Sequence, residues 1–209
     1  MTRDTQLLHQ AAARCLAYPD GEFHADVPLL RAALAPLRGG PADTLRLFLE
    51  QATALTPAAL AEHYVRVFDF GRRACLYLTW WTDGDTRRRG GALVRFKEHY
   101  RAHGFTWDSD ELPDFLPAVL EFAAASGSDA LLREHRPALE LLRLGLAEDG
   151  TPYAHVLDAV CATLPGPSAR DRAAALALAA GGPPTEEVGL ATAPYGHLRQ
   201  LPLLTGGRR

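Results

Sequence analysis

Apolar residues recur at intervals of three and four along most of the first 180 residues, a spacing that gathers them on one face of a helix. The clearest run follows the acidic stretch near residue 110 and comprises Leu112, Phe115, Leu116, Val119, Leu120 and Ala123. Prolines and glycines separate such runs, as they do at helix ends. The pattern predicts an all-α, single-domain bundle of roughly eight to ten helices over residues 1–180, followed by an irregular, proline- and glycine-rich tail over residues 181–209.

Capping residues and prolines set several expected boundaries. The second helix is expected to begin near Asp26, with Pro28 in its first turn. Pro113 is expected in the first turn of the helix that follows the acidic stretch. Pro137 predicts a kink or a break. Ser168 is expected to cap an alanine-rich helix that reaches residue 180.

The segment Cys75–Trp81 is the one stretch without a clear period. Its aromatic residues suit a strand, but no partner strand is apparent elsewhere in the chain. A lone strand leaves its backbone hydrogen-bonding groups unsatisfied. We therefore expect this segment to form a buried helix.

Composition and charge exclude some classes of protein. Apolar residues make up 47% of the 209-residue chain, mostly alanine and leucine, which favour helices. The formal charge of −3 argues against a dedicated nucleic-acid-binding protein, which usually carries a basic excess. Neither a signal-peptide pattern nor an apolar run long enough for a membrane span is apparent. These features predict a cytoplasmic protein that does not insert into the membrane.

Metal-binding and catalytic patterns are largely missing from the sequence. Cys15, Cys75 and Cys161 lie far apart, so neither a disulfide framework nor a CxxC motif is expected. His99 and His103 have the spacing of a zinc pair, but the glutamate of the zinc-protease motif is missing. No nucleophile motif or phosphate-binding glycine loop occurs. We expect neither a metal site nor an enzymatic activity.

Two arginine clusters in the central stretch admit two interpretations. Guanidinium groups of Arg72, Arg73, Arg87 and Arg89 can hold phosphate. They can equally pair with nearby carboxylates such as Asp83 and Asp85, and this internal charge network is the interpretation we favour.

The acidic stretch Asp108–Asp114 also admits two interpretations. Glu111 and Asp114 flank the expected start of a helix, where carboxylates are stabilised by the helix dipole by about 0.3–1 kcal/mol. Alternatively, they form an acidic rim beside apolar side chains, a surface suited to a basic, amphipathic peptide helix.

Four motifs in this order resemble the NarJ/TorD family of molybdoenzyme chaperones, and within it the chaperones of respiratory nitrate reductase. They are Leu16–Asp20, Tyr64 with Phe68 and Asp69, Asp83–Gly90, and Glu111–Pro117. The resemblance covers about residues 5–165. The family's acidic motif commonly reads Glu-Leu-Pro-Asp-His, whereas this chain has Phe115 in the last position.

The resemblance implies an all-helical, non-enzymatic, cytoplasmic chaperone. Such proteins bind the apo α subunit of nitrate reductase, including its N-terminal segment, and keep it competent to receive the molybdenum guanine dinucleotide cofactor before it docks on the membrane. The cofactor goes to the client and is not stably bound by the chaperone, and the proteins that make the cofactor are further candidate partners. The alternatives are a chaperone for another molybdoenzyme of the group and a helical nucleic-acid-binding regulator.

The aromatic clusters and carboxylates within these motifs predict where a client peptide would bind. An apolar groove with an acidic rim is expected from Tyr64, Phe68, Asp69, Leu76, Glu111, Pro113, Asp114 and Phe115.

Overall fold

The computed structural model describes residues 1–70, 74–84 and 87–180. In these ranges the chain forms eleven α-helices, one short π-helix and a single isolated β-bridge, which confirms the all-α prediction. The helices are α1 (Arg3–Leu16), α2 (Gly21–Leu34), α3 (Gly40–Ala54), α4 (Pro57–Tyr64), α5 (Trp80–Asp83), α6 (Arg87–Ala102), α7 (Leu116–Ser126), α8 (Ala130–Glu134), α9 (Arg136–Glu148), α10 (Tyr153–Thr163) and α11 (Arg172–Ala180). The π-helix η1 (Val65–Asp69) continues α4 directly. The expected tail over residues 181–209 lies outside the described residues.

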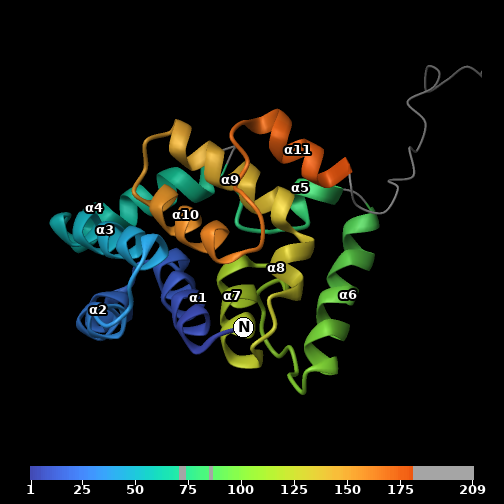
Figure 1. Ribbon diagram of the computed structural model, residues 1–209, viewed down its shortest axis with the longest axis horizontal. Coiled ribbons are helices and arrows are strands. Elements are labelled where there is room, and N and C mark those ends of the chain that lie inside the picture. Colours follow the sequence, from blue (N-terminus) through green and yellow to red (C-terminus); the bar gives the residue numbers. More distant parts are fainter. Residues whose placement is uncertain (71–73, 85–86, 181–209) are drawn as a thin grey trace, which may run out of the picture.

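Helix α1 lies at the centre of the packing. It contacts α7 along its length and also touches α2, α3 and α10 (Figure 1). Four of its six buried residues have small side chains, Ala11, Ala12, Ala13 and Cys15, which let neighbouring backbones approach closely. Helix α10 packs against both α3 and α9, and α11 packs on α9 beside a small separate core. Helix α6 forms one side of the molecule in Figure 1.

Two helix starts differ from the sequence prediction. Helix α2 begins at Gly21 rather than near Asp26, because the Asp20 side chain caps it by accepting from the Phe23 N–H at 2.8 Å. Pro28 therefore lies inside the helix. Helix α11 is capped by Asp171, which accepts from the Ala174 N–H at 2.8 Å, and not by Ser168.

The prediction of a buried helix over Cys75–Trp81 is wrong for most of that segment. Residues 74–76 belong to no helix, and Tyr77 forms an antiparallel bridge with Phe115. Leu78 N–H donates to the Asp114 carbonyl at 3.1 Å, and Leu116 N–H donates to the Leu76 carbonyl at 2.8 Å. The backbone partner is thus the turn before α7, which the sequence pattern assigned to a helix. For the same reason α7 begins at Leu116, and Pro113 precedes it.

One further boundary agrees with the structure. The predicted break near Pro137 occurs at His135, where α8 ends and α9 begins. Within the described ranges, no helix combines the length and apolarity that crossing a membrane requires.

Candidate functional site

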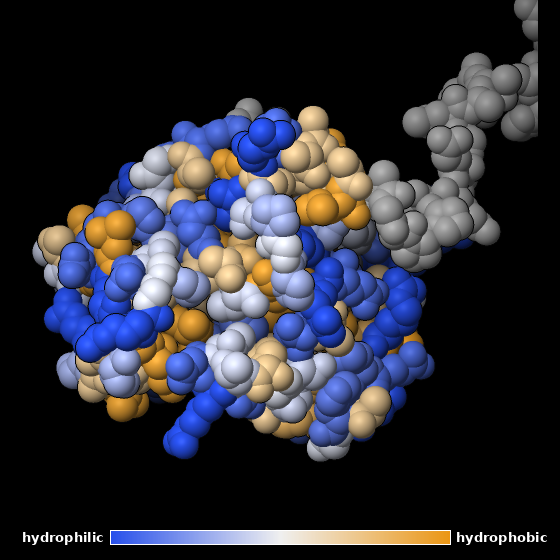
Figure 2. Space-filling view, in the orientation of Figure 1, coloured by the Kyte–Doolittle hydropathy of each residue, from blue (hydrophilic) through white to orange (hydrophobic). Residues whose placement is uncertain are grey.

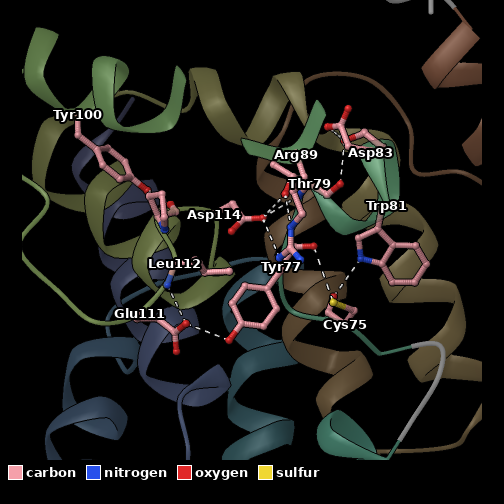
Figure 3. A network of polar contacts seen from close by, with 12 residues as sticks. Cys75, Tyr77, Thr79, Trp81, Asp83, Arg89, Tyr100, Glu111, Leu112 and Asp114 are labelled. Carbon is pink, nitrogen blue, oxygen red and sulfur yellow. Dashed lines mark hydrogen bonds and ion pairs between the residues drawn. The ribbon is translucent and has the colours of Figure 1, made fainter. Parts of the chain in front are cut away.

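Asp114 lies at the centre of a buried polar network that joins three separate parts of the chain (Figure 3). Its Oδ2 accepts from the Thr79 hydroxyl at 2.5 Å and from the Thr79 N–H at 3.0 Å. Its side chain is fully buried, and Oδ1 has no hydrogen-bond partner among the described residues. Because a buried charge needs such partners, the carboxylate fixes the turn before α7 against the 74–79 segment.

Arg89 connects this network to α6. Its Nε donates to the Thr79 hydroxyl at 3.1 Å, and a terminal nitrogen lies 4.0 Å from Asp114 Oδ2. The guanidinium also lies over the Tyr77 ring, 5.6 Å from its centroid. We call Thr79, Arg89 and Asp114 the hinge network, because they link α5, the start of α6 and the start of α7.

Three further hydrogen bonds hold the loop between α6 and α7. The Tyr100 hydroxyl donates to the Pro113 carbonyl at 2.5 Å, and the Trp107 indole donates to the Glu111 carbonyl at 3.0 Å. The Tyr77 hydroxyl donates to Glu111 Oε1 at 2.9 Å (Figure 3). Burial, together with this bond to a carboxylate, raises the pKa of Tyr77 to about 12. These three bonds therefore hold the second half of the loop, residues 107–113.

An open, mostly apolar cavity of about 620 Å³ lies between this loop and α7. We call it the aromatic groove. Its aromatic lining consists of Tyr100, Phe105, Trp107, Phe115 and Phe122, with Ala17, Pro117, Ala118 and Ala125 adding smaller apolar surfaces. The groove has the size of typical ligand-binding sites.

The aromatic rings of the groove support one another. Tyr100 stacks on Trp107 with a centroid distance of 5.5 Å, and Tyr100 and Phe122 lie 4.6 Å apart. Phe105 meets the edge of Phe122 at 5.5 Å and keeps 39% of its surface exposed. One wall of the groove is therefore packed into the core while Phe105 faces solvent.

Two carboxylates, Glu111 and Glu121, also line the aromatic groove. Glu111 uses Oε1 for the bonds from Tyr77 and from the Leu112 N–H, and Oε2 has no hydrogen-bond partner within the described ranges. Partial burial raises the pKa of the Glu121 carboxyl, opposed by the charge of Arg14. An apolar site with two carboxylates favours a ligand that is apolar on one side and cationic on the other.

The structure brings only some of the predicted groove residues to this site. Glu111 and Phe115 line it, and the buried Pro113 supports it through Tyr100. Asp114 is fully buried, so the expectation that it forms an exposed acidic rim is wrong. The sequence places Asp114 beside apolar residues but cannot show that the Thr79 donors face it from a segment 35 positions away.

The remaining predicted groove residues lie elsewhere. Tyr64 is buried, and its hydroxyl donates to the Leu16 carbonyl at 3.1 Å. Phe68 is half-buried and packs on Tyr64 and on Tyr153 at the edge of the core, with ring centroids 4.7 and 4.9 Å apart. Leu76 is buried at the β-bridge, and Asp69 is exposed at the end of η1. Tyr64 and Leu76 are core residues, Phe68 is half-buried against the core, and none of the three lines the aromatic groove.

Sequence reasoning missed Phe105, Trp107, Phe122 and Glu121 as groove residues. The sequence predictions relied on the helical spacing of apolar residues, and Phe105 and Trp107 belong to a stretch that lacks this spacing. The available signal was two aromatic residues within a polar loop, since exposed aromatic side chains on loops often mark binding sites.

The structure describes only some of the residues of the predicted charge network. Arg72, Arg73 and Asp85 lie outside the described residues. Arg87 is exposed at the start of α6, and Asp83 accepts from the Thr82 hydroxyl at 3.0 Å. Of the predicted arginines, Arg89 is the one whose contact with a carboxylate can be described.

The candidate metal ligands do not assemble. The rings of His99 and His103 lie 4.6 Å apart, and in the part of the chain that the structure describes no three His, Cys, Asp or Glu side chains are arranged to hold a metal ion. Cys15 and Cys161 are buried, Cys75 is half-buried, and all three are free thiols.

Comparison with known proteins identifies the family. The profile of the family described as nitrate reductase delta subunit matches residues 31–158. The chain is 34% identical over 167 residues to the probable nitrate reductase molybdenum cofactor assembly chaperone NarJ of Bacillus subtilis (strain 168), covering 78% of this chain and 91% of that protein.

Two further relatives are longer than the matched region. NarJ of Escherichia coli (strain K12), a nitrate reductase molybdenum cofactor assembly chaperone, is 34% identical over 152 residues, which are 70% of this chain and 64% of its own length. The nitrate reductase-like protein NarX of Mycobacterium tuberculosis (strain ATCC 25618 / H37Rv) is 39% identical over 157 residues, 74% of this chain but 24% of NarX. The NarJ relatives are named as chaperones and not as enzymes, in line with the expected lack of enzymatic activity. The chain belongs to the nitrate reductase delta subunit family, and its predicted resemblance to NarJ chaperones is confirmed.

Proposed function

We propose that this chain is an assembly chaperone that binds the N-terminal segment of the apo catalytic subunit of nitrate reductase in the aromatic groove. The observation that carries the proposal is the groove itself, a cavity of about 620 Å³ with five aromatic residues and two carboxylates in its lining. Family membership and the names of the NarJ relatives support the choice of client.

The groove suits a peptide helix that is apolar on one face and basic on the other. Apolar side chains of the peptide would pack on Phe105, Trp107 and Phe115 and would supply most of the affinity. Basic side chains would approach Glu111 Oε2 and the Glu121 carboxylate, which would mainly set the orientation and the association rate.

The hinge network would keep the groove in shape without touching the peptide. Thr79 and Asp114 fix the turn before α7, and Tyr77 fixes Glu111. A site that is already formed loses less conformational entropy on binding, which favours affinity.

Binding at this site would shield the client's N-terminal segment while the molybdenum cofactor enters the catalytic subunit. We infer that the chaperone acts in the cytoplasm and releases its client before the client docks on the membrane. The cofactor is cargo for the client, and no residue of the described chain is assigned to hold it.

Titration calorimetry with a synthetic peptide of the client's N-terminal segment tests the proposal. Phe105→Ala should weaken binding by about 2 kcal/mol, or roughly 30-fold, as truncating an aromatic interface anchor does. Because Phe105 is 39% exposed, this variant should remain folded. Phe70→Ala is the matched control, since Phe70 is 79% exposed and does not line the groove.

A second variant tests how much the groove carboxylates contribute to peptide binding. Glu121→Gln should weaken binding less than Phe105→Ala and should reduce its salt dependence, whereas Glu50→Gln, at an exposed position on α3, should change neither. Equal affinity for wild type and Phe105→Ala would place the peptide elsewhere, and no heat of binding at all would remove it from the mechanism.

A further inference from the structure

We propose that the outward face of α6 is a second interaction surface, which docks on an acidic patch of a folded protein partner. Five exposed basic residues form this cationic face: Arg87, Arg88, Arg95, Lys97 and Arg101. The opposite side of the helix is buried through Ala92, Phe96 and Tyr100. Figure 2 shows hydrophilic side chains over the side of the molecule where Figure 1 places α6.

The charge of α6 is opposite to that of the rest of the protein. The helix has six basic residues and one acidic residue, Glu98, a formal charge of +5. Because the whole chain carries −3, the remaining residues carry −8. A helix of 16 residues is about 24 Å long, so this positive charge extends along the one side of the molecule that α6 forms in Figure 1.

The carboxylates of residues 1–70, 74–84 and 87–180 form no ion pair with four of the five residues of this face. Arg14, Arg46, Arg133, Arg136 and Arg143, on other helices, each form an ion pair with an aspartate or a glutamate. Arg87, Arg95, Lys97 and Arg101 form none with the described residues, whereas Arg89, on the inner side of α6, lies 4.0 Å from the Asp114 carboxylate.

Two adjacent glycines at the start of α6 add an independent observation. A glycine inside a helix costs about 0.5–1 kcal/mol relative to alanine. A Cβ at Gly90 or at Gly91 would meet no atom within 4 Å, so packing inside this chain does not require either glycine. A partner that approaches the helix backbone between Arg87 and Val94 would require them.

The charge distribution favours a folded protein partner over nucleic acid or a membrane. Both of the latter extend beyond α6 and would meet the excess negative charge of the remaining surface. A local acidic patch would meet only the cationic face. Val94, 54% exposed at the centre of this face, suits the mixed apolar and polar character of a protein interface.

The test uses the apo catalytic subunit of nitrate reductase without its N-terminal segment, a probe whose choice rests on the proposed function. Wild-type chain should bind this truncated subunit, and Arg87→Glu with Lys97→Glu should weaken the binding at least about tenfold at low salt and flatten its salt dependence. Arg3→Glu with Arg170→Glu makes the same change in charge at exposed positions outside α6 and should bind like wild type.

Each alternative has its own result. Failure of wild type to bind the truncated subunit, or equal binding by both double variants, overturns the proposal. Binding of wild type to phosphatidylglycerol vesicles or to single-stranded DNA, abolished by the α6 variant, overturns it in favour of a membrane or a nucleic acid. The α6 variant should bind the N-terminal peptide with wild-type affinity, which shows that it is folded. If wild type does not bind the N-terminal peptide, the proposal that the aromatic groove binds it is refuted, whereas the result for α6 still stands.

Discussion

Replacing Asp114 should be the most destabilising change at the site. Asp114→Ala removes two charge-assisted hydrogen bonds from Thr79 and leaves the Thr79 N–H buried without its acceptor. A hydrogen bond to a charged group contributes about 1.5–3 kcal/mol, and an unsatisfied buried donor costs about 1–3 kcal/mol. The substitution also removes the cost of burying the Asp114 carboxylate away from water, which offsets part of the lost stability. We expect a net loss of about 3 kcal/mol in the free energy of unfolding.

Urea unfolding, followed by tryptophan fluorescence and by circular dichroism, measures this loss. With a denaturant slope of about 1–3 kcal/mol per molar urea, the midpoint should fall by about 1–3 M. Asp114→Asn keeps an oxygen for Thr79 and should lose only about 1–2 kcal/mol. Asp110→Ala, at an exposed position in the same loop, should change stability by less than about 0.5 kcal/mol. An Asp114→Ala midpoint equal to that of Asp110→Ala would refute the structural role assigned to the hinge network.

Three other changes test the scaffold. Glu140 is fully buried and accepts from Arg143 at 2.8 Å, so Glu140→Ala should cost about 3–5 kcal/mol in thermal or urea unfolding. Burial lowers the pKa of His9 to about 4, below the ordinary value of about 6.5 in the unfolded chain. The unfolded state therefore binds the proton first, and stability should fall by about 2 kcal/mol between pH 8 and pH 5, a component that His9→Gln should remove from unfolding curves. Gly127→Ala should cost about 1–2 kcal/mol because φ is 73°, whereas Gly91→Ala, on the open face of α6, should raise the melting temperature.

The helical fold was predictable because apolar residues recur along most of the chain with the helical period of about 3.6 residues, and capping residues mark many helix ends. The starts of α2 and α11 were misplaced because the local caps at Asp20 and Asp171 were missed, and the larger error falls where a distant segment supplies the backbone partner. Residues 74–79 pair with the turn before α7, an arrangement that no local pattern encodes. Tertiary hydrogen bonds there override the hydrophobic period that assigned both segments to helices.

The site was predictable in its region but not in its members. Two of the predicted residues, Glu111 and Phe115, line the aromatic groove, so the motifs led to the stretch that contains this cavity. Glu111 and Phe115 are half-buried, whereas Asp114 and Leu76 are buried. The sequence does not show this difference, because burial depends on which elements face each other. Phe105 lies in a loop without periodicity, and its place in the groove follows from its contact with Phe122 on α7.

Hydrogen–deuterium exchange of the chain with and without the client's N-terminal peptide tests the central claim most directly. The account predicts slower exchange in the loop over residues 103–115 and at the start of α7, which together form the aromatic groove, with no change in α2 and α3. The same protection should be absent when Phe105→Ala is mixed with an equal amount of peptide. Protection confined to α2, α3 and α4, with the groove unchanged by saturating peptide, would contradict the claim.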